Sequence, residues 1–294
     1  MKTMLEVFTK VAPRAYPNYA RAFQNDAALL TRFKINTPLR ISHFLAQTMH
    51  ECSRGTILFE NLRYTTTARL LKIFGVGNHS AAITPAEAPG FLNNPEKLGE
   101  RVYGLGNPRK ARELGNTYPG DGYRYRGGGL MQTTGGAAYQ RMGDKAHADF
   151  YGDPNLIVAP EYAVKPALYE WDEGNLNEYA DRNDIRTITR VINGGYNGLA
   201  ARQALFNEIW PIANDDDRPS PAWTEANADE ETRWLQEALN DLGSDPQLLV
   251  DGRYGPETAE AVKWFQTRAS LQVDGVAGEV TRAAIGLRLA QRRG

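Results

Sequence analysis

Four segments of the chain carry apolar residues at the i, i+3, i+4, i+7 spacing of an amphipathic helix. They lie at residues 4–11, 41–52, 164–171 and 185–192. Between residues 75 and 136 the chain is instead rich in Gly, Pro, Asn and Tyr. This composition predicts a long loop-rich region, and such a region in a compact domain usually lines a functional surface. The pattern predicts a mainly α protein.

The end of the chain contains an internal repeat. Val250 and Val273 each begin the pattern V-D-G-x-x-G-x-x-T-x-x-A, with an offset of 23 residues. Each Asp-Gly pair is a turn signal, and the residues after it favour the start of a helix. The apolar positions around the two repeats predict three short helices that share one core.

A stretch of acidic residues and prolines separates the two parts. Residues 212–231 carry a net charge of −6, whereas residues 1–211 carry +5 and residues 232–294 carry 0. Self-repelling charge and little apolar content predict an extended linker. We therefore expect a large domain at 1–211, a linker at 212–231 and a small domain at 232–294.

Composition excludes several classes of protein. Hydrophobic residues make up 41% and charged residues 23% of the 294 residues, which is typical of folded globular chains. No apolar run approaches the roughly 20 residues that cross a bilayer, so we expect no membrane insertion. Glu6 interrupts the N-terminal apolar stretch, which argues against a secretory signal peptide. The charge shows no basic stripe typical of nucleic-acid binding. A mildly basic first segment would suit an acidic polymer, and it is equally typical of an ordinary solvated surface.

Cysteine and histidine exclude disulfide and metal chemistry. Cys52 is the only cysteine, so the chain has neither an internal disulfide nor a thiolate zinc site. The four histidines show no metal-ligand spacing, and His50-Glu51 lacks the second histidine of the zinc-protease helix motif. We therefore expect no metal and no cofactor.

Glu51 and Glu60 are the first candidates for catalysis. Glycosidic bonds are cleaved by two carboxyl groups, one of which donates a proton while the other acts as base or nucleophile. Glu51 lies at the edge of the 41–52 apolar stripe, where partial desolvation would favour its protonated form. On one helix the two residues would lie about 13 Å apart along the axis, which exceeds the roughly 6.5–9.5 Å of inverting enzymes. We expect the helix to end at Ser53-Arg54-Gly55 and Glu60 to lie on a returning segment. Two glutamates nine residues apart also occur by chance.

The glycine-rich segment 123–139 is the second candidate. Its three consecutive glycines lack the Gly-Lys-Ser/Thr ending and the βαβ context of a phosphate loop. Glycine allows a ligand to approach the backbone, while Gln132, Thr134 and Tyr125 offer hydrogen bonds and an aromatic face. That mixture suits a sugar, although a glycine-rich turn with satisfied hydroxyl groups explains it equally well. Asn193, at the end of the 185–192 helix, could bind an acetamido group or act as a helix cap.

The same residues resemble glycoside hydrolase family 19, which includes plant-type chitinases and many phage endolysins. The motifs follow the family's order: Ala46-Gln-Thr-Met-His-Glu51, Phe59-Glu60-Asn-Leu-Arg-Tyr64, Gly122-Tyr-Arg-Tyr-Arg-Gly-Gly-Gly-Leu-Met-Gln-Thr-Thr-Gly135, Asp153-Pro-Asn-Leu156 and Thr189-Arg-Val-Ile-Asn-Gly-Gly-Tyr-Asn-Gly198. The small domain, including Phe265-Gln266, resembles the peptidoglycan-binding type 1 domain. The combination is similar to a modular phage or prophage endolysin, or to a related bacterial lytic enzyme.

The resemblance implies a lysozyme-like catalytic domain of two lobes and a role for each matching residue. Glu51 aligns with the general acid and Glu60 with the general base of an inverting hydrolysis that needs no metal. Thr134 aligns with the residue that helps to hold the attacking water. Substrate-binding residues align as well: Gln132, Asn193 and, in a later motif, Arg202; Tyr125 is the aromatic candidate.

Three positions depart from the family pattern. Gly128 and Gly136 stand where arginine is usual, and Ala138 stands where asparagine is common. These changes remove hydrogen-bond donors and weaken any transfer of chitin specificity.

The resemblance favours an endolysin that cuts the β-1,4 bonds of bacterial peptidoglycan, with peptidoglycan as both substrate and ligand of the small domain. A chitinase and a non-catalytic wall-binding protein remain the alternatives. For an endolysin without a signal peptide we expect the bacterial host's cytoplasm before lysis, release through a separate membrane-permeabilising protein, and a monomer.

Overall fold

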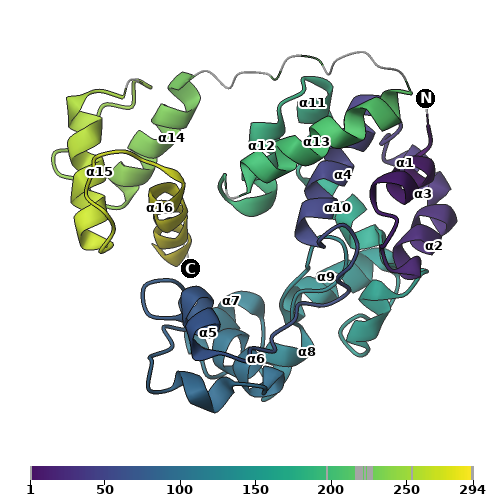
Figure 1. Cartoon of the computed structure of the whole chain (residues 1–294), viewed down its shortest axis with the longest axis horizontal. Helices are drawn as coiled ribbons and strands as arrows, with labels where there is room; N and C mark the ends of the chain where they lie inside the picture. Colours follow the sequence, from purple (N-terminus) through teal and green to yellow (C-terminus); the bar gives the residue numbers. More distant parts are fainter. Residues whose placement is uncertain are drawn as a thin grey trace. The chain divides into compact units, whose positions relative to one another are not determined.

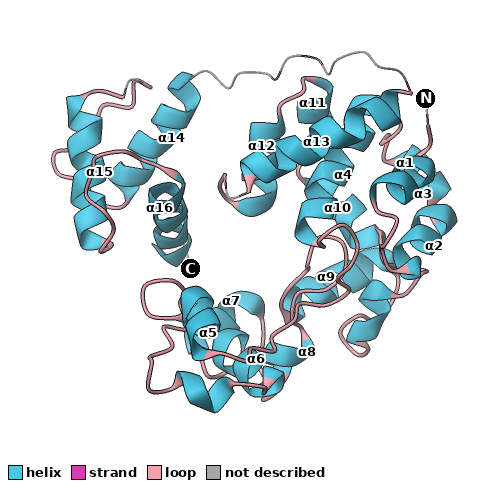
Figure 2. Ribbon diagram, in the orientation of Figure 1, coloured by secondary structure: helices cyan, strands magenta, loops and turns pink. Residues whose placement is uncertain are grey.

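The structure is a computed structural model that describes residues 2–196, 198–215, 221, 223, 228–252 and 254–292. It is mainly helical, which confirms the predicted fold class (Figure 2). Within those residues, extended pairing is limited to three isolated bridges: Phe59 with Gly128, Gly128 with Thr133, and Gly75 with Ile83.

The chain forms two compact units, each of which combines two stretches of sequence. The first unit comprises Met1–Glu173 and Leu205–Pro219, and the second comprises Gly174–Ala204 and Ser220–Gly294. This division does not follow the linear boundary expected at residue 211. Helix α13 (Leu199–Asn214) begins in the second unit and ends in the first.

The first unit contains ten α-helices and two 3₁₀ helices before α13 (Figure 1). They are α1 (Met4–Val11), α2 (Pro17–Asn25), α3 (Ala27–Arg32), α4 (Pro38–Glu51), α5 (Thr67–Phe74), η1 (Ala88–Phe91), α6 (Pro95–Tyr103), α7 (Pro108–Leu114), α8 (Asp121–Arg124), α9 (Gly136–Ala146), η2 (Pro154–Val158) and α10 (Lys165–Glu173).

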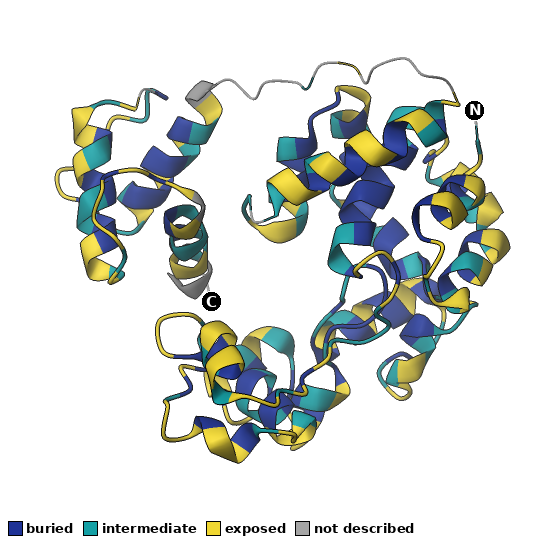
Figure 3. Cartoon of the chain, viewed as in Figure 1, coloured by how far each residue is buried: buried dark blue, intermediate teal, exposed yellow. Residues whose placement is uncertain are grey.

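The predicted helical stripes correspond to α1, α4 and α10. In α1, all four stripe residues are buried, and Thr3 forms a capping box with Glu6 at the start of the helix. Helix α4 begins at Pro38 behind the N-cap Thr37. Every residue from 41 to 49 of α4 is buried, so this helix is enclosed on all sides (Figure 3). Its last residue is therefore held in a fixed place by the surrounding core.

The region between residues 75 and 136 is more helical than its composition predicts. It contains η1, α6, α7 and α8. Two Asn-Pro pairs explain the difference, because the side chains of Asn94 and Asn107 accept hydrogen bonds from the backbone N–H groups of Lys97 and Lys110. An asparagine N-cap followed by proline at the first helical position starts a helix, so these two local signals outweigh the loop-like composition.

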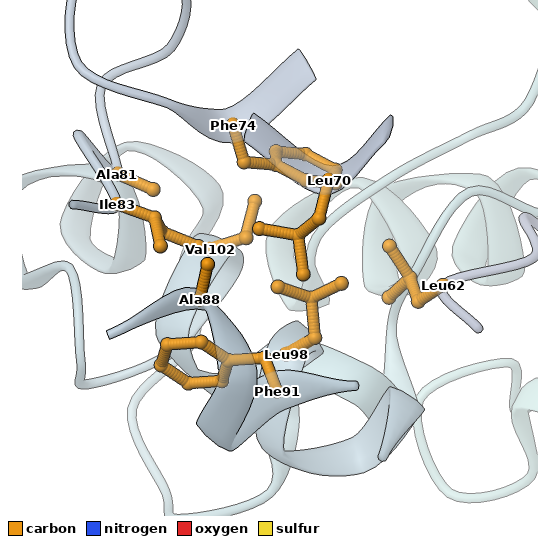
Figure 4. Close-up of a cluster of buried hydrophobic side chains, with 9 residues drawn as sticks. All are labelled: Leu62, Leu70, Phe74, Ala81, Ile83, Ala88, Phe91, Leu98 and Val102. Atoms are coloured by element: carbon orange, nitrogen blue, oxygen red, sulfur yellow. The ribbon is translucent and has the colours of Figure 1, made fainter. Parts of the chain in front are cut away.

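Helices α5, η1 and α6 share a core of their own (Figure 4). Its buried residues are Leu62, Leu70, Phe74, Ala81, Ile83, Ala88, Phe91, Leu98 and Val102. Tyr64 and Tyr103 are partly buried and pack against this cluster. A second cluster includes Tyr125 and Tyr139 of the glycine-rich segment together with Phe150. The first unit thus contains separate cores, in keeping with the predicted two-lobed enzyme.

The second unit contains α11 (Leu176–Asp181), α12 (Ile185–Asn193), α14 (Ala228–Asp241), α15 (Pro256–Arg268) and α16 (Glu279–Arg292). The last three form the predicted three-helix core. In α12 the predicted stripe is only partly buried, since Ile185 and Ile188 are enclosed but Val191 is 44% exposed. Helix α13 ends at Asn214 and helix α14 begins at Ala228, so both ends of the expected 212–231 linker are helical. Most residues between them lie outside the described part of the chain.

Two buried glutamines explain the V-D-G repeat. Gln236 donates to Asp251 and Thr258 of the first repeat and accepts from the N–H of Gly252. Gln266 makes the equivalent contacts with Asp274, Thr281 and Gly275 of the second repeat. Both glycines have positive φ, 77° and 71°, as expected of Asp-Gly turns. In each repeat, the Asp, Gly and Thr positions therefore all bind the same buried glutamine.

Candidate active site

The candidate acid, Glu51, is the last residue of α4. The chain turns back directly after it, because Ser53, Arg54 and Gly55 all have positive φ. A Cβ atom on Gly55 would lie 2.6 Å from that of Ala15, so no other residue fits there without movement. The predicted helix end between the two glutamates is therefore confirmed.

The candidate base, Glu60, lies on the returning segment that the sequence predicts. Phe59 pairs with Gly128, and the N–H of Glu60 donates to the carbonyl of Gly127 at 2.7 Å. The hydroxyl of Tyr103, at the end of α6, donates to Oε1 of Glu60 at 3.0 Å. Burial raises the pKa of Glu60, while the hydrogen bond from Tyr103 and the charge of Arg126 oppose that rise.

Segment 127–134 forms a short antiparallel ribbon next to Glu60. Gly128 pairs with Phe59 on one side and with Thr133 on the other. A Cβ atom on Gly127 would lie 3.0 Å from Oε1 of Gln132 and 3.4 Å from Cβ of Glu60. Glycine at this position thus lets the backbone pass between Gln132 and the base.

The side chains of Gln132 and Thr134 form hydrogen bonds with the backbone of this ribbon. Gln132 has a φ of 51°, and its side chain donates to the carbonyl of Gly129 at 2.8 Å. The hydroxyl of Thr134 donates to the carbonyl of Gln132 at 2.8 Å, which leaves its oxygen lone pairs as acceptors. The structure therefore places Gln132 close to Glu60, on either side of Gly127, and Thr134 beside the backbone of Gln132.

Packing explains two of the three departures from the family pattern. A Cβ atom on Gly128 would lie 2.5 Å from the hydroxyl of Tyr139, which donates to the carbonyl of Arg126. A Cβ atom on Gly136 would lie 2.9 Å from the carbonyl of Gly115. Neither position has room for an arginine side chain in this fold. Nothing in the structure explains Ala138.

Tyr125 is not placed to bind a sugar. Its ring is 1% exposed and stacks on Tyr151 at 4.9 Å between centroids, and its hydroxyl donates to the carbonyl of that residue. A ring that stacks on a sugar must have at least one face open to the ligand, and the ring of Tyr125 has neither face open. The substrate-binding role predicted for Tyr125 is corrected to a packing role.

Asn193 and Arg202 belong to the second unit. Asn193 is the exposed last residue of α12, and the cap itself is Gly194 in the left-handed conformation. Arg202 is fully buried within α13, with 0% exposure. Their predicted roles as substrate ligands stay predictions.

Two further residues that the sequence does not predict contact Glu60 or the 127–134 ribbon. Tyr103 lies 43 residues from Glu60, and no local pattern marks it. Glu170 of α10 accepts a hydrogen bond from the hydroxyl of Thr133 at 3.4 Å. Burial is the largest of the influences that raise the pKa of Glu170 to about 7, and the neighbouring charge of Glu51 adds to the effect.

The described residues contain no group of three or more His, Cys, Asp and Glu side chains that could hold a metal ion. No helix in the described part of the chain combines the length and apolar character that a membrane crossing requires.

Comparison with known proteins gives the family of this mainly helical chain. A glycosyl hydrolase family 19 domain-containing protein of Haemophilus influenzae is 30% identical over 215 residues, which are 71% of this chain and 96% of that protein. The chain belongs to glycosyl hydrolase family 19. It is therefore a glycoside hydrolase, as predicted.

The small domain matches a family of its own. Residues 228–285 match the family model of the peptidoglycan binding domain. Among solved structures, chitinase C from Streptomyces griseus is similar at 16% identity and a TM-score of 0.46, over 75% of this chain and 98% of that one. A mutant of chitinase C gives the same identity and TM-score over 75% of this chain and 80% of its own.

Proposed function

We propose that the protein is an endolysin that hydrolyses the β-1,4 glycosidic bonds of bacterial peptidoglycan. The observation that carries the proposal is the presence, in one chain, of a family 19 hydrolase and a peptidoglycan-binding domain. Together these two parts support a cell-wall glycosidase. The muramidase bond, between N-acetylmuramic acid and N-acetylglucosamine, is the finer part of the proposal.

Glu51 acts as the general acid in this scheme. It protonates the oxygen of the leaving sugar while the glycosidic bond breaks. Its position at the end of the buried helix α4 holds the carboxyl group in place, which favours proton transfer along a fixed direction.

Glu60 acts as the general base. It takes a proton from a water molecule, which attacks the anomeric carbon from the face opposite to the leaving group. The hydroxyl of Thr134 is free to accept a hydrogen bond from this water, since its own proton goes to Gln132. The hydrogen bond from Tyr103 stabilises the carboxylate of Glu60. The scheme predicts hydrolysis with inversion and no covalent intermediate.

In the cell, this role places the folded enzyme in the cytoplasm of the bacterial host, as a monomer, until a separate protein permeabilises the membrane. The small domain then holds the enzyme on the insoluble wall. Expression in bacteria with and without membrane permeabilisation tests this part, and lysis without permeabilisation would contradict it.

The glycosidic bond that the enzyme cleaves is identified from the sugar at the reducing end of the products. Purified sacculi are digested, the fragments are reduced and the reducing-end sugar is identified by mass spectrometry, with soluble chitin oligomers in parallel and Glu51→Gln as the inactive control. Reduced muramic acid supports the muramidase proposal. Reduced glucosamine ends indicate a glucosaminidase, and preferential cleavage of chitin oligomers indicates a chitinase. No cleavage of either substrate by the folded protein indicates a non-catalytic wall-binding protein.

A further inference from the structure

Asn116 is a buried polar residue close to the candidate site, and the acid–base scheme does not use it. It follows Gly115, the left-handed C-cap of α7, and is 2% exposed. Its side-chain amide donates to the backbone carbonyl of Tyr103 at 2.9 Å and accepts from the backbone N–H of Gly136 at 2.8 Å. A carbonyl only accepts and an N–H only donates, so these two partners fix the orientation of the amide.

The first partner of Asn116 is the residue that contacts the candidate base. Tyr103 is the last residue of α6, and its hydroxyl donates to Oε1 of Glu60 at 3.0 Å. The carbonyl of a last helical residue has no partner within its own helix, and Asn116 supplies one. Asn116 therefore holds the backbone of the same residue whose side chain reaches the carboxylate of Glu60.

The second partner of Asn116 belongs to the segment that carries Thr134. Gly136 is the first residue of α9 and comes two positions after Thr134. Between them, the N–H of Gly135 donates to the carbonyl of Tyr125 at 2.8 Å. The end of the 127–134 ribbon is thus joined both to Tyr125 and, through Gly136, to Asn116.

Segments 114–116 and 135–137 approach each other at backbone distance. A Cβ atom on Gly135 would lie 2.6 Å from the carbonyl oxygen of Leu114. A Cβ atom on Gly136 would lie 2.9 Å from the carbonyl oxygen of Gly115. Glycine at these two positions allows the close approach, and the short side chain of Asn116 reaches Gly136 across it.

We propose that Asn116 is a positioning residue of the active site, which fixes Tyr103 in its place at Glu60 and joins it to the ribbon that carries Thr134. This inference rests on the proposed role of Glu60 as the general base. Asn116 acts through Tyr103 and not on the substrate itself. Without its amide, the carbonyl of Tyr103 loses a partner and the hydroxyl loses its fixed place at the carboxylate.

The kinetic test is a double-variant cycle on the pH dependence of kcat/KM, with soluble glycan fragments as substrate. It compares wild type, Asn116→Ala, Tyr103→Phe and the double variant. Loss of the hydrogen bond from Tyr103 disfavours the ionised form of Glu60, so the acid limb should move to higher pH. At a pH on that limb, kcat/KM should fall by roughly tenfold in Asn116→Ala, with KM little changed. Asn116→Ala should add no further shift in the Tyr103→Phe background.

Asn94→Ala is the matched control. Asn94 is exposed, and its side chain caps the start of the same helix by accepting from the N–H of Lys97 at 3.0 Å. Its removal weakens α6 at the end away from Tyr103 and should leave the pH profile unchanged. A uniform loss at every pH in Asn116→Ala, or an acid limb that superimposes on wild type, would overturn the proposal. Equal shifts with and without the Tyr103 hydroxyl would overturn it as well, since Asn116 would then act independently of Tyr103.

Asn116→Asp takes the place of the alanine variant if that protein does not fold. An ionised aspartate keeps the size of Asn116 and an acceptor for Gly136, but it cannot donate to the carbonyl of Tyr103. Its new charge acts on Glu60 in either background. The part of the shift that Tyr103 transmits should be absent from the Tyr103→Phe background.

A second measurement does not depend on activity. Carboxyl-carbon NMR follows the titration of Glu60 in the same four proteins, and its midpoint should rise in Asn116→Ala only while the Tyr103 hydroxyl is present. An unchanged midpoint refutes the proposal. Failure of the proposed function has a different signature, because Glu60→Gln would then retain turnover, whereas the midpoint of Glu60 reports on Asn116 in either case.

Discussion

The hydroxyl of Tyr103 donates a hydrogen bond of 3.0 Å to Oε1 of Glu60. Tyr103 is the last residue of α6 and packs against the α5–α6 core, so this bond ties the candidate base to a lobe formed by other parts of the chain. The bond also acts on the charge of Glu60. It stabilises the carboxylate and so opposes the rise in pKa that burial causes.

Replacing Tyr103 with phenylalanine should therefore change the pH profile. Glu60 must be ionised to accept a proton, so activity rises with pH as this group loses its own proton. Without the hydroxyl its pKa rises further, and the acid limb of kcat/KM moves to higher pH. Soluble glycan fragments serve as substrate, and Tyr118→Phe, at a tyrosine that is 66% exposed, is the control. An unmoved acid limb in a folded Tyr103→Phe protein would show that the bond does not tune the base.

Glu51→Gln should remove nearly all turnover and leave binding and stability close to wild type. General acid catalysis accounts for about 10²–10⁴ in rate, and the amide cannot donate a comparable proton. Turbidity loss of permeabilised bacteria measures turnover, and co-sedimentation with sacculi measures binding. Near-wild-type lysis by the folded variant would end the assignment of Glu51.

The stereochemistry of the product tests the role of Glu60 independently. A base that activates water gives inversion, so the newly released reducing end should have the α configuration. Proton NMR during the first minutes of hydrolysis, before mutarotation, distinguishes the two anomers. A β product would mean a covalent intermediate, even if both glutamates prove essential.

The contact between Gly128 and Tyr139 makes a prediction about stability. Gly128→Ala places a Cβ atom 2.5 Å from the tyrosine hydroxyl, and we expect overpacking to cost about 1–3 kcal/mol of unfolding free energy. Tyr139→Phe removes the clashing oxygen, so the double variant should lose less than the two single losses added together. Denaturant unfolding of all four proteins completes the cycle, and strict additivity would contradict the proposed contact.

Local signals predicted much of this fold, and long-range contacts limited the rest. The helical stripe of α4, the chain reversal at Gly55 and the Asp-Gly turns each depend on neighbours in sequence. The bonds from Tyr103 to Glu60 and from Thr133 to Glu170 join residues 43 and 37 positions apart, so no local pattern reveals them. The identity of Tyr125 could not reveal its burial either, because an aromatic ring stacks equally well on a sugar or on Tyr151.

The small domain offers a test of tethering within the full chain. Gln266 is 1% exposed, and its side chain binds Asp274, Gly275, Val276 and Thr281. Gln266→Leu removes the partner of two groups in buried residues, the N–H of Gly275 and the hydroxyl of Thr281, at about 1–3 kcal/mol for each unsatisfied group, so the three-helix module should unfold.

Loss of the module should separate the two substrates. Tethering raises the local concentration of enzyme on an insoluble polymer and leaves the active site unaltered. Gln266→Leu should therefore lose co-sedimentation with sacculi and much of its activity on them, but little activity on short soluble glycans. Gln247→Leu, at an exposed position of the same domain, is the matched control and should behave as wild type. An equal loss on soluble and insoluble substrates would show instead that the catalytic part depends on the small domain for its own stability.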